Sequence, residues 1–179
     1  MSRFAVKTLI LALAIVIASC GWQLRGTPSL PDEMAVIYIS SSNPHGAFSR
    51  ELRRLLGSGD SEITWNREEA TAIVRVISTD SSRQVLSVNL AGRPEEIRVV
   101  YQVEFEVRTA EGDTIIERQR MQLHRDISTD PADPLGASQE ASRLVTALEE
   151  EIVQSVVLRI EALARRVPDK ENPSRNGAR

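Results

Sequence analysis

The chain has 179 residues, the usual size of one domain, and its 22 Lys and Arg are outnumbered by 25 Asp and Glu, giving a formal net charge of −3. This acidic balance argues against a nucleic-acid-binding protein, because such proteins usually carry a concentrated basic excess. Aromatic residues make up only 4% of the chain, so the core must consist mainly of Val, Ile, Leu and Ala.

Residues 1–19 have the composition of an export signal. A basic start precedes an unbroken apolar run from Leu9 to Ala18, which is too short to span a bilayer but suits a secretory signal. The sequence Ile17-Ala18-Ser19-Cys20 resembles the lipobox of bacterial lipoproteins, which predicts cleavage between Ser19 and Cys20 and acylation of Cys20. The alternatives are an ordinary export signal with an incidental Cys20, or a short membrane anchor.

Acylation would make Cys20 an anchor to outer-membrane lipid. One fatty chain holds a protein to a membrane only marginally, and lipoproteins of this kind, by resemblance, carry three. Gly21 is not an aspartate, which fits release to the outer membrane. Cys20 is the only cysteine, so we expect neither a disulfide nor a catalytic thiol. Without residues 1–19 the chain has 20 basic and 25 acidic residues, a net charge of −5.

The first part of the domain reads as a strand, a helix and a second strand. Val36 to Ile39 is wholly apolar, as expected for a strand buried on both faces. The apolar residues from Phe48 to Leu56 recur at helical spacing, and Gly57 ends the run. Glu62 to Trp65 then predicts a second strand, parallel to the first.

Two long strands and a hairpin follow. Residues 72–88 are β-type with a polar centre, which predicts a bend, a bulge or an edge. Residues 97–108 alternate between apolar and mostly polar, which predicts one dry and one wet face. Glu111-Gly112-Asp113 predicts a hairpin loop.

If residues 110 and 114 flank this loop, apolar residues of the two strands lie opposite each other on the buried face. On the solvent-exposed face, residues of opposite charge then lie opposite each other. The predicted charge pairs are Glu106 with Arg118, Glu104 with Arg120, and Arg98 with Asp126. In this register Arg98, Arg118 and Arg120 are neutralised cross-strand partners, in preference to a free anion-binding patch.

The last element is a long helix. Asp133-Pro134 gives an N-cap and a first-turn proline, and an apolar stripe runs from Ala141 to Leu163. Pro168 ends the domain, and residues 168–179 form a polar tail that we expect to be disordered. The sequence therefore predicts one α+β domain over residues 20–167. Its fold would be a two-layer sandwich, with two helices packed on one face of a mixed β-sheet and the other face polar.

The sequence shows no catalytic machinery. Neither His45 nor His124 has a second histidine or cysteine at ligand spacing, so we expect no metal site and no cofactor. No glycine-rich phosphate loop follows a strand, and no serine lies in a nucleophile elbow. We therefore expect a protein that is not an enzyme.

Two stretches carry a family resemblance. The segment Cys20-Gly21-Trp22-Gln23-Leu24-Arg25-Gly26 resembles the start of mature LPS-assembly lipoproteins of the LptE family. The helix entry from Asn43 to Leu56 is similar to the Pro-x-Gly-x-x-Ser-Arg run of that family. The order of elements also agrees, so the similarity covers nearly the whole mature chain.

The resemblance implies a lipid-anchored protein on the periplasmic side of the outer membrane. It would plug the LptD β-barrel, assist assembly of that barrel, and serve lipopolysaccharide transport to the cell surface. Family members have basic residues proposed to touch lipopolysaccharide phosphates, and Arg93 is the nearest candidate for one of them. The sequence departs at the second position, because Asp133 to Gln139 contains no Lys or Arg. The alternative is an unrelated outer-membrane lipoprotein that acts as a periplasmic ligand-binding or envelope-structural module.

Overall fold

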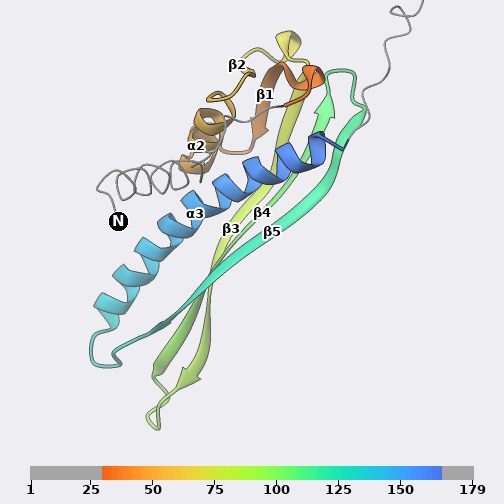
Figure 1. Cartoon of the computed structure of the whole chain (residues 1–179). Coiled ribbons are helices and arrows are strands. Elements are labelled where there is room, and N and C mark those ends of the chain that lie inside the picture. Colours follow the sequence, from red (N-terminus) through yellow and green to blue (C-terminus); the bar gives the residue numbers. More distant parts are fainter. Residues whose placement is uncertain (1–29, 167–179) are drawn as a thin grey trace, which may run out of the picture.

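Figure 1 shows the computed structural model, which describes residues 30–166. The signal at 1–19, the cleavage site at Ser19 and Cys20, the Cys20–Gly26 segment and the tail at 168–179 lie outside the described residues. The elements in chain order are η1 (Asp32–Met34), β1 (Val36–Ser41), α2 (Ala47–Leu56), β2 (Glu62–Thr64), η2 (Arg67–Glu69), β3 (Ala72–Val88), β4 (Pro94–Thr109), β5 (Thr114–Ser128) and α3 (Pro134–Ala164).

The strands form one mixed sheet in the order β2-β1-β3-β4-β5. β1 pairs in parallel with β2 and with β3, whereas β3, β4 and β5 pair antiparallel. The helix α3 crosses one face of this sheet, and α2 lies beside it over β1 (Figure 1). The predicted α+β fold, a mixed sheet with two helices on one face, is therefore confirmed.

The core lies between the helices and the alternating apolar residues of β4. Val99, Val103 and Phe105 are at most 1% exposed, as are Leu148 and Ile152 of α3. Full burial of such a side chain contributes about 1.5–3 kcal/mol relative to its exposed state. The period of two predicted for residues 97–108 therefore places the apolar side chains of β4 in the core.

The helix ends follow local sequence signals. The Asp133 side chain accepts a hydrogen bond from the Gly136 amide at 2.9 Å, and Pro134 is the first residue of α3. Gly57 caps α2, and its amide donates to the Arg53 carbonyl at 2.9 Å. Both predicted helix boundaries are confirmed, because side-chain capping and proline geometry act within a few residues of the helix end.

The predicted β4–β5 register is confirmed from Glu104 to Ile97, where Glu104 pairs with Arg120 and Ile97 pairs with Ile127. Nearer the loop it is wrong, because the register shifts twice between Phe105 and Arg108. Glu117 and Arg118 together oppose the single residue Glu106. Such a bulge locally disrupts the ladder, so the predicted Glu106–Arg118 pair does not form.

The strands β3 and β4 extend beyond the helices as a twisted hairpin, and α3 diverges from it toward the end that joins β5 (Figure 1). β3 is buried at Val74 but has exposed side chains from Thr79 onward. Register shifts at Val76/Ser78 and Val85/Ser87 flank the polar centre of this strand, so of the predicted bend, bulge or edge the structure shows the bulge, and β3 is not an edge strand. We call the part of the hairpin formed by residues 79–96 the strand extension, and the part of the sheet that packs under α2 and α3 the covered half.

Candidate functional site

Arg93, the residue singled out by the family resemblance, closes the turn between β3 and β4. The Asn89 side chain accepts hydrogen bonds from the amides of Ala91 and Arg93 at 2.9 and 3.0 Å. Gly92 has a φ of 75°, which glycine adopts at little cost. The Arg93 guanidinium donates to the Pro131 carbonyl at 3.3 Å, so it joins this turn to the loop that precedes α3.

A cleft of about 620 Å³ opens between the strand extension and the start of α3. Its lining is largely apolar, from residues such as Pro94, Ile97 and Ala137, and Arg83 and Arg93 supply cationic groups. Asp130 is the acidic residue of the lining, and its carboxylate accepts a bond from the Ala132 amide at 2.8 Å. Within residues 30–166 no ion pair joins a carboxylate to either arginine. The cleft can therefore bind an anionic group next to apolar surface.

The sequence did not predict the position of Arg83. This residue comes from β3, yet its guanidinium donates to the hydroxyls of Ser138 and Ser142 on α3, at 3.5 and 3.1 Å. It brings a cation to the start of α3, where residues 133–139 contain none. In the structure Arg83 pairs with Val99, so both side chains lie on the side of the sheet that faces the helices. Had the β3–β4 register been predicted, it would have placed Arg83 on that side.

The strand extension also exposes aliphatic side chains close to this cleft. Val85 and Val88 are 57% and 54% exposed, and Leu90, in the turn, is fully exposed. Leu135, in the first turn of α3, is 67% exposed. These exposed aliphatic side chains are available for contact with another molecule.

The opposite, polar face of the sheet carries most of the predicted cross-strand ion pairs. Arg98 binds Asp126 through two hydrogen bonds of 2.7 and 2.8 Å, and this bond to Arg98 lowers the pKa of Asp126. Arg120 lies 3.6 Å from Glu104. These two predicted pairs are confirmed, and bidentate geometry makes the first the better defined.

Glu106 has different partners from the one predicted. Its side chain is 6% exposed, and its Oε1 atom accepts from Arg108 at 2.9 Å and from Arg75 at 3.3 Å. The bond to Arg108 holds the pKa of Glu106 below its usual range, with help from Arg75, although burial acts in the opposite direction. Arg118 instead lies 4.0 Å from Glu104.

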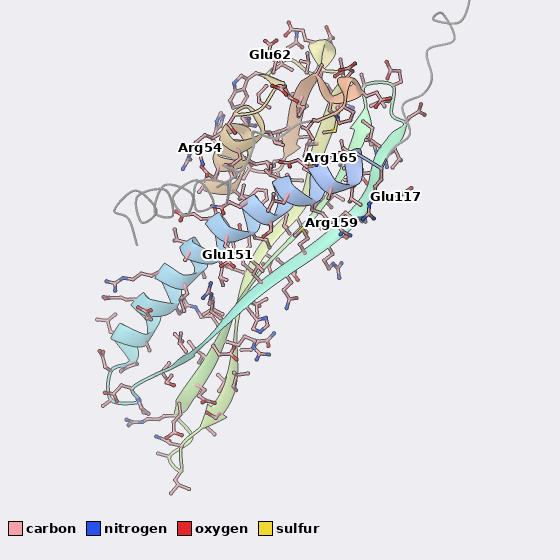
Figure 2. The ribbon with its side chains drawn as sticks, in the orientation of Figure 1. Arg54, Glu62, Glu117, Glu151, Arg159 and Arg165 are labelled. Carbon is pink, nitrogen blue, oxygen red and sulfur yellow. The ribbon has the colours of Figure 1, made fainter. Side chains whose placement is uncertain are left out.

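Polar contacts also join α3 to the edge strand β5. Glu151 accepts from Arg125 at 2.8 Å, and Arg159 donates to the Gln119 side chain at 3.0 Å. Figure 2 shows Glu151 and Arg159 along α3 on the side toward β5. These links orient the helix over the covered half of the sheet.

The two histidines lie in different parts of the fold. The His45 ring stacks on Trp65 with centroids 5.7 Å apart, and the guanidinium of Arg53 in α2 lies 4.0 Å from the same Trp65 ring. His124 is exposed on β5. Within residues 30–166, no group of three or more His, Cys, Asp or Glu could hold a metal ion. No helix in the same part of the chain has both the length and the apolar character needed to cross a membrane.

Relatives of this chain are lipoproteins. It is 26% identical to the LPS-assembly lipoprotein LptE of Photorhabdus laumondii over 156 residues, 87% of this chain and 85% of that protein. It is 27% identical over 177 residues to the protein of the same name from Yersinia pestis, covering 98% of this chain and 84% of the relative.

Solved structures share the fold. The solution structure of lipoprotein B from Nitrosomonas europaea aligns with a TM-score of 0.68 at 21% identity, over 82% of this chain and 94% of that one. The crystal structure of rare lipoprotein B from Shewanella oneidensis aligns with a TM-score of 0.62 at 23% identity, over 73% and 96%. The family model described as "LptE: Lipopolysaccharide-assembly" matches residues 34–160, well over half of the chain. The chain therefore belongs to the LptE family.

Proposed function

We propose that this chain is an outer-membrane lipoprotein that acts in lipopolysaccharide assembly as the plug and assembly partner of the LptD β-barrel. The family match over residues 34–160 carries the proposal. In it, residues 1–19 are removed as a signal, acylated Cys20 anchors the protein on the periplasmic side of the outer membrane, and residues 20–167 form the functional domain.

The two unlike faces of the sheet support the plug role. One face packs under α2 and α3 and forms the core, while the other carries ion pairs such as Arg98–Asp126 and remains open to solvent. The lumen of an outer-membrane barrel is polar. A plug needs an ordinary core beneath a hydrogen-bonding exterior, and this sheet provides both.

The cleft supports direct contact with lipopolysaccharide. Arg93, together with Arg83, places guanidinium groups beside an apolar lining, and guanidinium is well suited to phosphate. Lipopolysaccharide combines phosphates with acyl chains, so one cleft can hold both kinds of group. In this proposal Arg83 supplies the cation that residues 133–139 lack, and the protein acts by binding, without catalysis.

Copurification of the lipidated wild-type chain from mild-detergent membranes tests the plug role. We expect a large β-barrel in stoichiometric amount. A preparation without such a barrel, but with a small ligand in the 620 Å³ cleft, would instead favour a periplasmic ligand-binding lipoprotein.

The anchor is tested separately with Cys20→Ala. This variant should carry no fatty acid, and any membrane retention should then depend on the barrel. Membrane attachment through acyl chains in the variant would contradict the assignment of Cys20.

The cleft is tested with Arg83→Glu and Arg93→Glu, each measured for lipopolysaccharide binding. Arg143→Glu, on the exposed side of α3 with a side chain 78% exposed, gives the same charge change away from the cleft. We expect each cleft variant to weaken binding by about tenfold or more, and the control to bind like wild type. Equal binding by all of them would refute the proposed contact.

A further inference from the structure

We infer that one end of the polar sheet face docks onto a carboxylate-rich protein surface, which is the lumen wall of the barrel. This inference rests on the proposed function and adds the chemistry of the contact. We call this surface the arginine face. It consists of Arg67, Arg75, Arg108, Arg118 and Arg120, with Glu104 and Glu106 between them.

The first part of the arginine face is a hollow of about 460 Å³ at the end of the sheet near the β4–β5 loop. Arg67 from η2, Arg75 from β3 and Arg108 from β4 line it, together with the Ser40 hydroxyl of β1. Buried Glu106 binds Arg75 and Arg108 through one oxygen atom. This carboxylate therefore fixes two guanidinium groups at the wall of the hollow.

The second part lies beside the first, on β4 and β5. Glu104 is 18% exposed and lies 3.6 Å from Arg120 and 4.0 Å from Arg118. Alternation from Arg120 already places Arg118 on this face, and the bulge opposite Glu106 adds Glu117 to it, because it inserts one extra residue into β5. Glu117 lies in the same bulge and projects outward in Figure 2, and no ion pair joins it to these arginines within the described part of the chain.

Glu104 and Glu106 each form ion pairs with two arginines. Four strand arginines face Glu104, Glu106 and, in the bulge, Glu117, which leaves an excess of one positive charge; Arg67 adds a second, because no ion pair of its side chain occurs within residues 30–166. The arginine side chains of the strands are 44–71% exposed. This excess of positive charge occurs on one face of a chain whose formal net charge is −3.

The chemistry of the surroundings favours a protein surface over a lipid. Ile73, the large apolar residue of the hollow, is only 6% exposed, and the lining as a whole is about as polar as it is apolar, so acyl chains would find little apolar surface there. The cleft near Arg93 differs, since its lining is largely apolar. The arginines are also spread over three strands and η2 rather than gathered around one point. Their geometry suits several carboxylates on a facing wall, and charge complementarity of this kind sets specificity and association rate.

Retention of the barrel by charge-reversed protein tests the inference. Full-length lipidated wild type and the double variant Arg118→Glu/Arg120→Glu are compared for barrel bound in mild detergent over a range of salt concentrations. We expect the double variant to bind about tenfold more weakly or worse. Wild-type binding should weaken as salt increases, because exposed charges are screened.

The matched control is Arg143→Glu/Arg166→Glu, which makes the same charge change on and after α3, away from the sheet face. It should retain the barrel like wild type. If the double variant fails to fold, as judged by circular dichroism, barrel binding by Arg67→Glu is measured in its place. This change breaks no side-chain hydrogen bond or ion pair within residues 30–166.

The outcomes separate the two proposals. If wild type retains no barrel, both the plug role and the arginine-face contact are overturned. If the barrel binds equally to wild type and to the arginine-face variants, only the present inference is overturned. It is also overturned if those variants keep the barrel and lose lipopolysaccharide, because the face would then bind a saccharide or phosphate.

Discussion

The covered half of the sheet and the strand extension are built from the same strands but differ in what stabilises them. Val74 and Val85 lie on the same side of β3, yet Val74 is fully buried and Val85 is 57% exposed. Val74 belongs to the core cluster that includes residues of α2 and α3, whereas α3 diverges from the far part of the β3–β4 hairpin (Figure 1). Besides the bonds of Arg83 and Arg93 to α3 and the loop before it, the extension is held by ladder hydrogen bonds, and it leaves apolar side chains such as Val85 exposed.

The same valine-to-alanine change at both positions gives the largest expected difference. Val74→Ala removes two buried methyl groups and leaves a cavity, so we expect a loss of about 2–3 kcal/mol in the free energy of unfolding. Val85→Ala should cost less than about 1 kcal/mol, since only strand propensity and partial burial change. Urea denaturation midpoints at constant slope measure both. Equal losses would show that the extension packs as tightly as the covered half.

Glu106→Gln should cause the next largest loss in the free energy of unfolding. The bond from Arg108, with help from Arg75, lowers the pKa of Glu106, so the ionised form stabilises the folded state. That stabilisation is present at pH above the unfolded value of about 4.3 and is lost as pH falls through the lowered folded-state pKa. At pH 7 we expect a cost of about 1–2 kcal/mol. Denaturation of both proteins at a series of pH values from 7 downward should show the difference shrinking once the pH falls below about 4.3; a gap independent of pH would contradict it.

Asp133→Ala tests the junction between the two regions. The Asp133 carboxylate accepts from the Gly136 amide at the start of α3, where the helix leaves the sheet. Loss of this cap should cost about 1 kcal/mol. Hydrogen exchange should quicken in the first turn of α3 and stay unchanged near Ile152. Asp133→Asn is the matched control, because asparagine also caps helices well, and it should behave nearly like wild type.

Local sequence patterns were sufficient to predict most of the covered half. The alternation in residues 97–108 fixed which side of β4 is buried, because a strand has a period of two. Matching charges fixed the register at Arg98 and Glu104. The pair with Glu106 was wrong, because one extra residue in β5 shifts the ladder and leaves almost no trace in the sequence.

The candidate site was much less predictable. Arg93 was identified through the family resemblance, but its contact with Pro131 spans 38 residues. The contacts of Arg83 with α3 span 55 and 59 residues, and depend on the angle at which the helix leaves the sheet. Helix periodicity gives the buried stripe of α3 and does not give this angle, so the cleft became visible only in the structure.

The smallest effect comes from a charge cycle at Glu104 and Arg120, within the covered half. Glu104→Arg should destabilise the hairpin, and adding Arg120→Glu should partly restore it, with a coupling of about 0.2–1 kcal/mol. Recovery should be incomplete, because Arg118 also lies 4.0 Å from Glu104 and would then face another arginine. Adding Arg118→Glu as well should recover more. The same cycle at Arg98 and Asp126 is the control, since within residues 30–166 neither residue forms an ion pair with a third arginine or carboxylate, and it should restore more fully. A cycle at Glu104 with no coupling would contradict the register on which the arginine face depends.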